Sequence, residues 1–443
     1  MNETVPPRMP SFGEAFRYWL KLGFISFGGP AGQIAIMHQE LVERRRWISE
    51  HRYLHALNYC MLLPGPEATQ LAIYISWLMH GVKGAVIAGV LFFLPAFMLI
   101  SLLAGMYLQF GEVPAVQGVL YGIKPAVVAI VLFAAWRIGS RAIKNEVLAT
   151  IAVLAFVGIL FFRIDFPWIV LAAAVLGIFG GKIMPGKFAT GGGHGISMAS
   201  HGPALIDDDT PPPPHAVFSW GRLAGTTAVF VSIWVLAMAL LSGAPSLSLM
   251  GEFFTKAAFL TLGGAYAVLP YVYQNAVEQF GWLTGPQMMD GLALGETTPG
   301  PLIMVVTWVG YLGGVAKEAA IHPIAAGLAG AAVATFFTFL PSFFFILVGA
   351  PLIESTRGEI RFTAPLTAIT AAVVGVILNL AVFFAWHTYW PKATASAPFD
   401  GPFDVLAVVV SVACFLALWR YKADIIKTIG ACALLGLVYS FCR

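Results

Sequence analysis

Long apolar stretches dominate the sequence and limit what kind of protein it can form. Hydrophobic residues make up 59% of the 443 residues, and charged residues make up only 11%. A soluble protein of this size needs far more polar surface, so the composition excludes a cytosolic enzyme, a disordered protein and a nucleic-acid-binding protein. The sequence therefore predicts an all-α polytopic membrane protein, embedded in the lipid bilayer.

Thirteen apolar stretches separated by short charged turns are candidate membrane segments. They cover residues 13–37, 54–79, 84–108, 115–137, 147–162, 166–182, 219–242, 251–272, 288–314, 323–350, 364–387, 402–420 and 425–442.

Residues 183–218 interrupt this pattern with a glycine run, an acidic triplet and four consecutive prolines. That composition is typical of a solvated linker without a core. We therefore expect an N-terminal membrane unit over residues 1–182, a cytoplasmic linker over 183–218 and a C-terminal membrane unit over 219–443.

No motif for cofactor-dependent or hydrolytic chemistry occurs in the sequence. The linker histidines His194, His201 and His215 stand near the acidic triplet, but linker composition explains them without a metal. The four cysteines show no CxxC or Cys/His ligand spacing, and no Walker, GxSxG or HExxH motif is present. The sequence therefore predicts no metal, no cofactor and no enzymatic function.

The two halves repeat the same sequence pattern. At a constant offset, Trp47 aligns with Trp282, and the run Pro64-Gly65-Pro66 aligns with Pro299-Gly300-Pro301. After a short insertion in half two the register shifts once, and FFLPAF (92–97) then aligns with TFLPSF (338–343). Chance rarely keeps one register over such motifs, so the sequence predicts two homologous halves.

Positive charges indicate that the two halves have opposite orientations. Half one carries Arg44, Arg45, Arg46 and Arg52 after its first segment, whereas the equivalent stretch 273–293 has no Lys or Arg. The turn before 115–137 has none, whereas its equivalent in half two contains Arg357 and Arg361. Because positive residues mark the cytoplasmic side, equivalent turns lie on opposite faces. This is an inverted-topology repeat, the architecture of many secondary transporters.

The same charges indicate which segments cross the membrane. If all thirteen cross, Lys and Arg divide into 15 inside and 10 outside. If 13–37, 54–79, 251–272 and 288–314 are re-entrant or broken, the division becomes 19 and 6. The positive-inside rule therefore favours nine full spans plus four re-entrant or broken segments.

Each of these four segments contains a glycine–proline or double-glycine break. The breaks read FGGPAGQ (27–33), LPGPE (63–67), LGGAY (262–266) and TPGPL (298–302). A proline there suits the first residue of a half-helix, whose free backbone N–H groups and positive end make an anion site. The alternative is packing glycines and kink prolines, which are common in membrane helices. Their repeat-equivalent positions favour a discontinuous-helix transport site.

The candidate substrate-binding residues lie in and beside the breaks, with one lysine from the segment 115–137. They are Gly28, Gly29, Pro30, Gly32, Gln33, Pro64, Gly65, Pro66, Gln70, Lys124, Gly263, Gly264, Tyr266, Thr297, Thr298, Pro299, Gly300 and Pro301. Lys124 is either a counter-ion for the substrate or a lysine that snorkels to the outer face.

Two carboxylates beside the breaks, Glu67 and Glu296, are candidates for proton coupling. Protonation of either would remove its repulsion of an anionic substrate, although each can instead form a structural ion pair. Arg44, Arg45 and Arg46 are expected either to steer anions towards the inner mouth or to anchor the chain at lipid headgroups.

These motifs resemble the chromate ion transporter family. FGGPAGQIAIMHQELVERRRW in half one and LGGAYAVLPYVYQNAVEQFGW with GETTPGP in half two carry the resemblance, which covers roughly 13–137 and 251–387. The chain is similar to a long-chain, two-domain member of this family. The family's GGP motif corresponds to residues 28–30, and its PGP motif corresponds to residues 64–66 and 299–301. Many relatives read AHI after GGP, whereas this chain reads AGQI.

The resemblance implies efflux of chromate through the bacterial inner membrane and chromate resistance. Sulphate is a similar tetrahedral dianion, so a sulphate transporter or exchanger stays open as an alternative. An anion channel fits the same breaks, whereas a membrane-embedded chromate reductase lacks flavin, haem or paired-cysteine motifs. The coupling ion and the oligomeric state, including a homodimer, also stay open.

Overall fold

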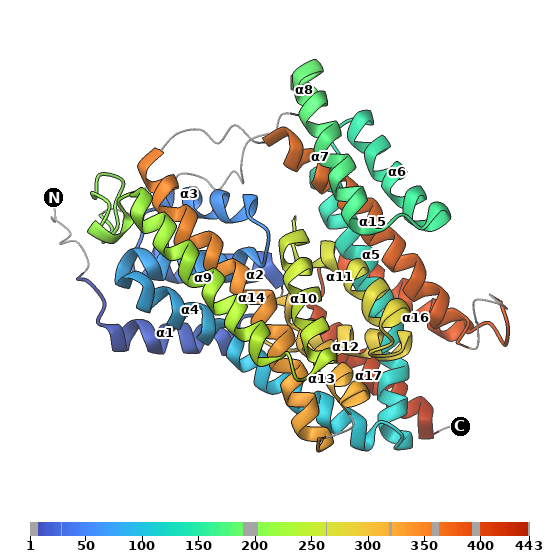
Figure 1. The fold of residues 1–443 in the computed structure, drawn as a ribbon. Helices are drawn as coiled ribbons and strands as arrows, with labels where there is room; N and C mark the ends of the chain where they lie inside the picture. The colour runs from blue at the N-terminus through green and yellow to red at the C-terminus, as the bar shows by residue number, and fades with distance from the viewer. Residues whose placement is uncertain are drawn as a thin grey trace.

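The computed structural model describes residues 8–27, 29–188, 203–262, 264–318, 321–356, 363–391 and 399–441. Within this part of the chain the regular elements are helical, apart from one isolated β-bridge between Ile48 and Ile206. The predicted all-α polytopic membrane fold is confirmed (Figure 1).

The α-helices are α1 (Phe12–Ile25), α2 (Gly29–His38), α3 (Glu50–Leu62), α4 (Glu67–Phe110), α5 (Pro114–Ala142), α6 (Glu146–Phe162), α7 (Phe166–Ile183), α8 (Pro185–Phe188), α9 (Trp220–Leu240), α10 (Pro245–Leu260), α11 (Ala265–Tyr273), α12 (Gly285–Thr297), α13 (Val305–Lys317), α14 (Pro323–Thr356), α15 (Thr363–Tyr389), α16 (Val405–Arg420) and α17 (Ile425–Phe441). Two π-helices, η1 (Gln39–Arg44) and η3 (Gln274–Gln279), and two 3₁₀ turns, η2 (Pro214–Ala216) and η4 (Leu302–Met304), complete them.

Each of the nine predicted full spans corresponds to one helical stretch of the described chain. Six helices, α4, α5, α7, α9, α14 and α15, are long and apolar enough to cross a membrane, and α6, α16 and α17 are shorter apolar helices. Helix α4 includes parts of two predicted segments, 54–79 and 84–108. A kink separates these parts, because Gly81 has a φ of +62°. Half two instead ends α13 near the equivalent point and begins α14 after its insertion.

The four predicted breaks all occur. Helices α1 and α10 end before the double-glycine motifs, and α2 and α11 begin within or directly after them. Helices α3 and α12 end before the PGP motifs, and α4 and η4 begin after them. Gly65 and Gly300 turn the chain at these motifs with φ angles of +124° and +119°, a region that side chains rarely adopt.

Equivalent elements recur at the spacing that the sequence predicts. Helices α3 and α12 start at Glu50 and Gly285, and the offset between these starts equals the offset between Trp47 and Trp282. The two π-helices keep the same spacing. The two halves also bond each other reciprocally. The Gly65 N–H donates to the Thr261 carbonyl at 2.8 Å, and the equivalent Gly300 N–H donates to the Ser26 carbonyl at 2.9 Å.

Packing at the centre supports the predicted inversion. The rings of Phe93 in α4 and Phe339 in α14, which are repeat-equivalent, stack with centroids 4.4 Å apart. Gly89, one turn earlier in α4, lies against Phe343, one turn later in α14. The two equivalent helices therefore cross in opposite directions about a pseudo-twofold relation, which is the geometry that an inverted repeat requires.

The C-terminal helices of each half pack on the other half. Helices α16 and α17 contact α5, whereas α6 and α7 contact the equivalent α15. Small residues permit close approach, because Gly122 of α5 lies against the backbone of α17 and Gly375 of α15 lies against that of α6. The halves are therefore interlocked.

The described part of the linker, residues 203–218, is largely solvent-accessible but docks on half one around Ile206. Leu205 and Ile206 donate backbone hydrogen bonds to Arg46 and Trp47, and Ile206 accepts one from Ser49. Ile206 is buried because it contributes an apolar side chain to the core of half one. His194 and His201 lie outside the described residues, and His215 hydrogen-bonds the Trp77 carbonyl at 2.7 Å.

We expect Gly300→Ala to lower the apparent melting temperature in detergent. A Cβ at Gly300 would lie 2.6 Å from the Ala96 Cβ, and the positive φ adds backbone strain, which costs about 1–3 kcal/mol. Gly225 in α9 is the matched control, because a Cβ there meets no atom within 4 Å. Gly225→Ala should leave the melting temperature unchanged or higher. Equal melting temperatures for the two variants would contradict this account.

Candidate functional site at the helix breaks

A small cavity lies where the four breaks meet. Its wall consists of residues from both halves: Pro30, Gln33, Pro66, Glu67, Ala68, Gly264, Ala265, Pro301 and Leu302. The cavity volume is about 10 Å³, which is room for about one water molecule. A tetrahedral oxyanion therefore requires the wall to move apart before it can enter.

Four helix N-termini converge on this cavity, two from each half. Helices α2, α4 and α11 and the turn η4, which continues into α13, all begin among its wall residues. Pro66, Gly264 and Pro301 precede three of them and provide no side-chain cap. By contrast, Ser49 and Thr284 cap α3 and α12, which begin elsewhere. First-turn N–H groups without a cap, together with positive helix ends, favour an anion in the cavity.

Two glutamine side chains hold the breaks in shape. Gln33 is buried, and its Nε2 donates to the carbonyls of Gly300 at 2.6 Å and Ser26 at 3.3 Å. It therefore joins a break of half two to one of half one. Gln70 donates to the Pro64 carbonyl at 2.7 Å and closes the first PGP turn.

The two predicted coupling carboxylates have different surroundings. Glu67 is part of the cavity wall, and its carboxylate forms no hydrogen bond or ion pair with the described residues. Glu296 instead accepts a short hydrogen bond from the Tyr266 hydroxyl. Glu67 is thus a partly exposed carboxylate at the point where helix ends attract an anion.

Several predicted site residues lie away from the cavity wall. Thr297 and Thr298 donate their hydroxyl protons to carbonyls of their own helix α12. Lys124 forms an ion pair with Asp290 in α12, with Nζ and Oδ1 3.8 Å apart. Gly28 and Gly263 lie outside the described residues, whereas Gly29 begins α2 with a φ of +69°. Gly32, Tyr266 and Pro299 also lie outside the wall.

The arginine cluster after α2 is engaged locally. Arg44 and Arg45 pair with Glu40 at 2.6 and 3.3 Å. Burial tends to raise the pKa of Glu40, but hydrogen bonds from the two guanidinium groups lower it below its ordinary value. Arg45 also stacks over Tyr18 and Trp47, with 5.1 Å to each ring centroid. The cluster therefore anchors η1 and leaves Arg44 largely exposed.

Sequence analysis missed two buried ionic contacts. Asp290 is only 3% exposed in α12, and Glu354 is only 4% exposed near the end of α14. Each is an ionisable residue within or beside an apolar stretch, which by itself marks a functional position in a membrane protein. Their partners are far away in sequence, so no local pattern indicated the pairing.

Comparison with known proteins identifies relatives along nearly the whole chain. A chromate transport protein of Cupriavidus metallidurans is 30% identical over 450 residues, covering 99% of this chain and 98% of that protein. A chromate transport protein of Pseudomonas aeruginosa is 32% identical, covering 98% and 94%. An uncharacterised transporter of Bacillus subtilis is 26% identical over 36% of this chain but 90% of its own length. No solved structure matches the chain.

The sequence model of the chromate transporter family matches two regions, residues 13–178 and 248–437. The starts of the two matches, at positions 13 and 248, have the same offset as Trp47 and Trp282 of the internal repeat. The resemblance found in the motifs is therefore confirmed over both halves, and the protein is a transport protein rather than an enzyme. The chain belongs to the chromate transporter family.

Proposed function

We propose that this chain is a secondary transporter that exports chromate across the bacterial cytoplasmic membrane and thereby confers chromate resistance. The observation that carries the proposal is the convergence of four helix N-termini, two from each half, on one cavity. Such ends bind oxyanions through backbone N–H groups. Two relatives with the printed name chromate transport protein support chromate as the substrate.

The interlocked halves support transport by alternating access. The proposed repeats 1–182 and 219–443 meet at the cavity, and inverted repeats carry their substrate sites at such interfaces. The cavity has room for about one water molecule in this conformation, which favours a carrier over a permanently open channel. The membrane potential, negative inside, favours export of an anion by about 2.3 kcal/mol per charge for each 100 mV.

We assign the oxyanion oxygens to the first-turn N–H groups of α2, α4, α11 and η4. Pro30, Pro66 and Pro301 fix the starts of three of these helices, and Gln33 keeps the breaks of the two halves together. Lys124 and the cluster Arg44–Arg46 act outside the binding site, the first through Asp290 and the second at the membrane surface.

Purified protein should take up chromate into vesicles when its external face points into the lumen. The membrane potential must then be positive in the lumen, so that it favours entry of the anion. Uptake should continue against a chromate gradient, and the chromium should keep its oxidation state. Sulphate uptake without chromate uptake would overturn the substrate assignment. Purely downhill flux at channel rates would indicate an anion channel, and reduced chromium would indicate an enzyme.

Ala265→Pro tests the role of the backbone N–H groups. Ala265 stands where half one has Pro30, at the first position of α11, where proline fits but provides no N–H. A hydrogen bond to a charged group contributes about 1.5–3 kcal/mol, so the half-saturating chromate concentration should rise roughly 10- to 100-fold. Ala265→Ser keeps the N–H and should behave like the original chain. Unchanged chromate affinity in the proline variant would remove this donor from the site.

Glu67 should make oxyanion binding depend on pH. When its carboxylate is ionised it repels a dianion in the cavity, so chromate affinity, expressed for the dianion, should rise as the pH falls. Glu67→Gln should remove this dependence, whereas Glu296→Gln should retain it because Glu296 is bonded to Tyr266. Full pH dependence in both variants would exclude both residues from coupling.

A further inference from the structure

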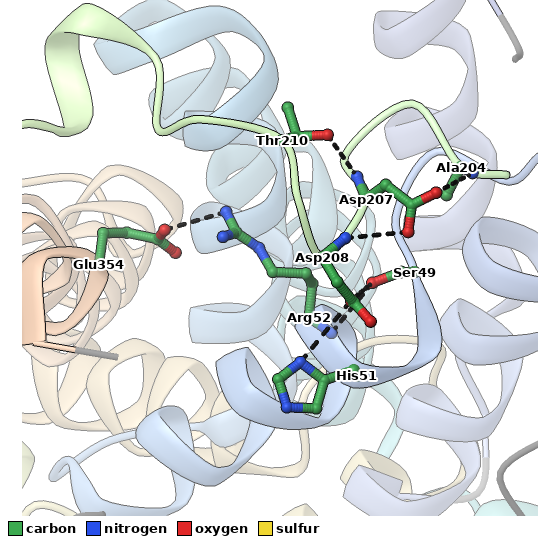
Figure 2. A network of polar contacts seen from close by, with 8 residues as sticks. All are labelled: Ser49, His51, Arg52, Ala204, Asp207, Asp208, Thr210 and Glu354. Carbon is green, nitrogen blue, oxygen red and sulfur yellow. Dashed lines mark hydrogen bonds and ion pairs between the residues drawn. The ribbon is translucent and has the colours of Figure 1, made fainter. Parts of the chain in front are cut away.

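One buried ion pair joins the two halves beside α3. Arg52 of α3 lies 2.9 Å from the Glu354 carboxylate of α14, and their side chains are only 8% and 2% exposed (Figure 2). The hydroxyl of Tyr74 in α4 also donates to this carboxylate. The charge of Glu354 is therefore shared between two elements of half one.

A second ion pair, of which only the carboxylate is buried, joins the halves beside α12. Asp290 of α12 accepts a hydrogen bond from the Tyr107 hydroxyl of α4 at 3.0 Å. Lys124 of α5 lies 3.8 Å from the same carboxylate. Here half two provides the helix before the break, and half one provides its partners.

The two ion pairs hold the repeat-equivalent helices α3 and α12, although the ionic residues themselves do not stand at equivalent positions. Helices α3 and α12 are repeat-equivalent, and Asp290 aligns with His55, which lies one turn after Arg52. Glu354 and Tyr107 lie near the C-terminal ends of α14 and α4, which cross in opposite directions. Figure 1 accordingly shows α3 in the upper part of the molecule and α12 in the lower part.

Each held helix leads directly into the cavity wall. Helix α3 ends at Leu62, immediately before the break that contains Pro66, and α12 ends at Thr297, immediately before the break that contains Pro301. A movement of either helix away from its partner therefore displaces one wall of the cavity. The ion pairs are placed where they can hold that wall shut from one side.

We propose that Arg52–Glu354 and Lys124–Asp290 are the latches of the two gates, which open alternately during transport. The proposal rests on the proposed function, because it assigns regulation to the same cavity. Separating a buried ion pair without replacement partners is strongly unfavourable, so opening both latches together is disfavoured. With both latches closed, as in this structure, the cavity has room for only about one water molecule.

The two latches differ in strength. Arg52–Glu354 is short and buried, and the linker reinforces its helix where Asp208 accepts a hydrogen bond from Ser49 at 2.5 Å (Figure 2). Lys124–Asp290 is longer, and the Lys124 side chain is 29% exposed. The latch at α12 therefore opens more readily, and the empty protein favours access from that side.

The test measures access to the cavity from each side of the membrane, without substrate. Ala68→Cys places a reporter in the cavity wall of a chain whose four native cysteines are replaced by serine. A membrane-impermeant maleimide is then applied to right-side-out and inside-out vesicles. Neutral double variants, Arg52→Gln with Glu354→Gln and Lys124→Gln with Asp290→Asn, leave no unpaired buried charge at either latch.

We expect each neutral double variant to raise the labelling rate of the cysteine at position 68 about tenfold or more from one side only. For the variant of the Arg52–Glu354 pair at α3 this is the cytoplasmic side, and for the variant of the Lys124–Asp290 pair at α12 it is the external side. Tyr74→Phe and Tyr107→Phe each remove one hydrogen bond to a latch carboxylate and retain both charges. Tyr74→Phe should raise labelling from the cytoplasmic side and Tyr107→Phe from the external side, each by a smaller factor. These two variants keep the test decisive if a double variant misfolds. Neutralising the exposed pair Glu252–Lys256 in α10 should change nothing.

Faster labelling from the same side in both variants, or no change in either, would overturn the latch assignment. Because no oxyanion is present, the result does not depend on chromate being the substrate. Opposite-sided labelling in a chain that carries no chromate would support the latches and refute the proposed substrate.

Discussion

The structure depends on how backbone groups at the four breaks find partners at membrane depth. Inside a bilayer each unpaired N–H or carbonyl is costly, so interrupted helices persist only where they are buried in protein or line a cavity. Here the halves satisfy each other, because Gly65 bonds Thr261 and Gly300 bonds Ser26. Gln33 adds a third bond across the interface. The N–H groups that remain at the helix starts are the ones that we propose bind the oxyanion.

Sequence alone predicted the features that local chemistry determines. Each PGP turn depends on a glycine between two prolines, and Gly65 and Gly300 adopt positive φ angles there. Because the residues that form the turn are adjacent in sequence, both turns and their repeat spacing could be recognised from the sequence. The ionic latches could not, because Glu354 and Arg52 are brought together only by the packing of α14 on half one. Lys124 had no recognisable partner in the sequence because Asp290 belongs to the other half of the chain.

The linker contains a contact that its average composition does not reveal. Its glycines, prolines and aspartates are typical of a solvated segment, yet one apolar residue among them, Ile206, is buried in half one. Backbone pairing beside Ile48 and the bond between Asp208 and Ser49 complete the contact. A short docking motif leaves little signal in average composition because most of the described residues around it remain at least partly accessible to solvent.

Differences between the two halves provide a basis for unequal access to the cavity from the two membrane faces. Two identical halves would give equal access from both membrane faces, whereas this chain has different residues at equivalent points. Half one has Pro30 and Glu67 in the cavity wall where half two has Ala265 and Leu302. The latches also carry reversed charges on α3 and α12 and differ in length. In the proposed mechanism the duplicated fold provides the two access states, and a few unmatched side chains determine which of them the empty protein favours.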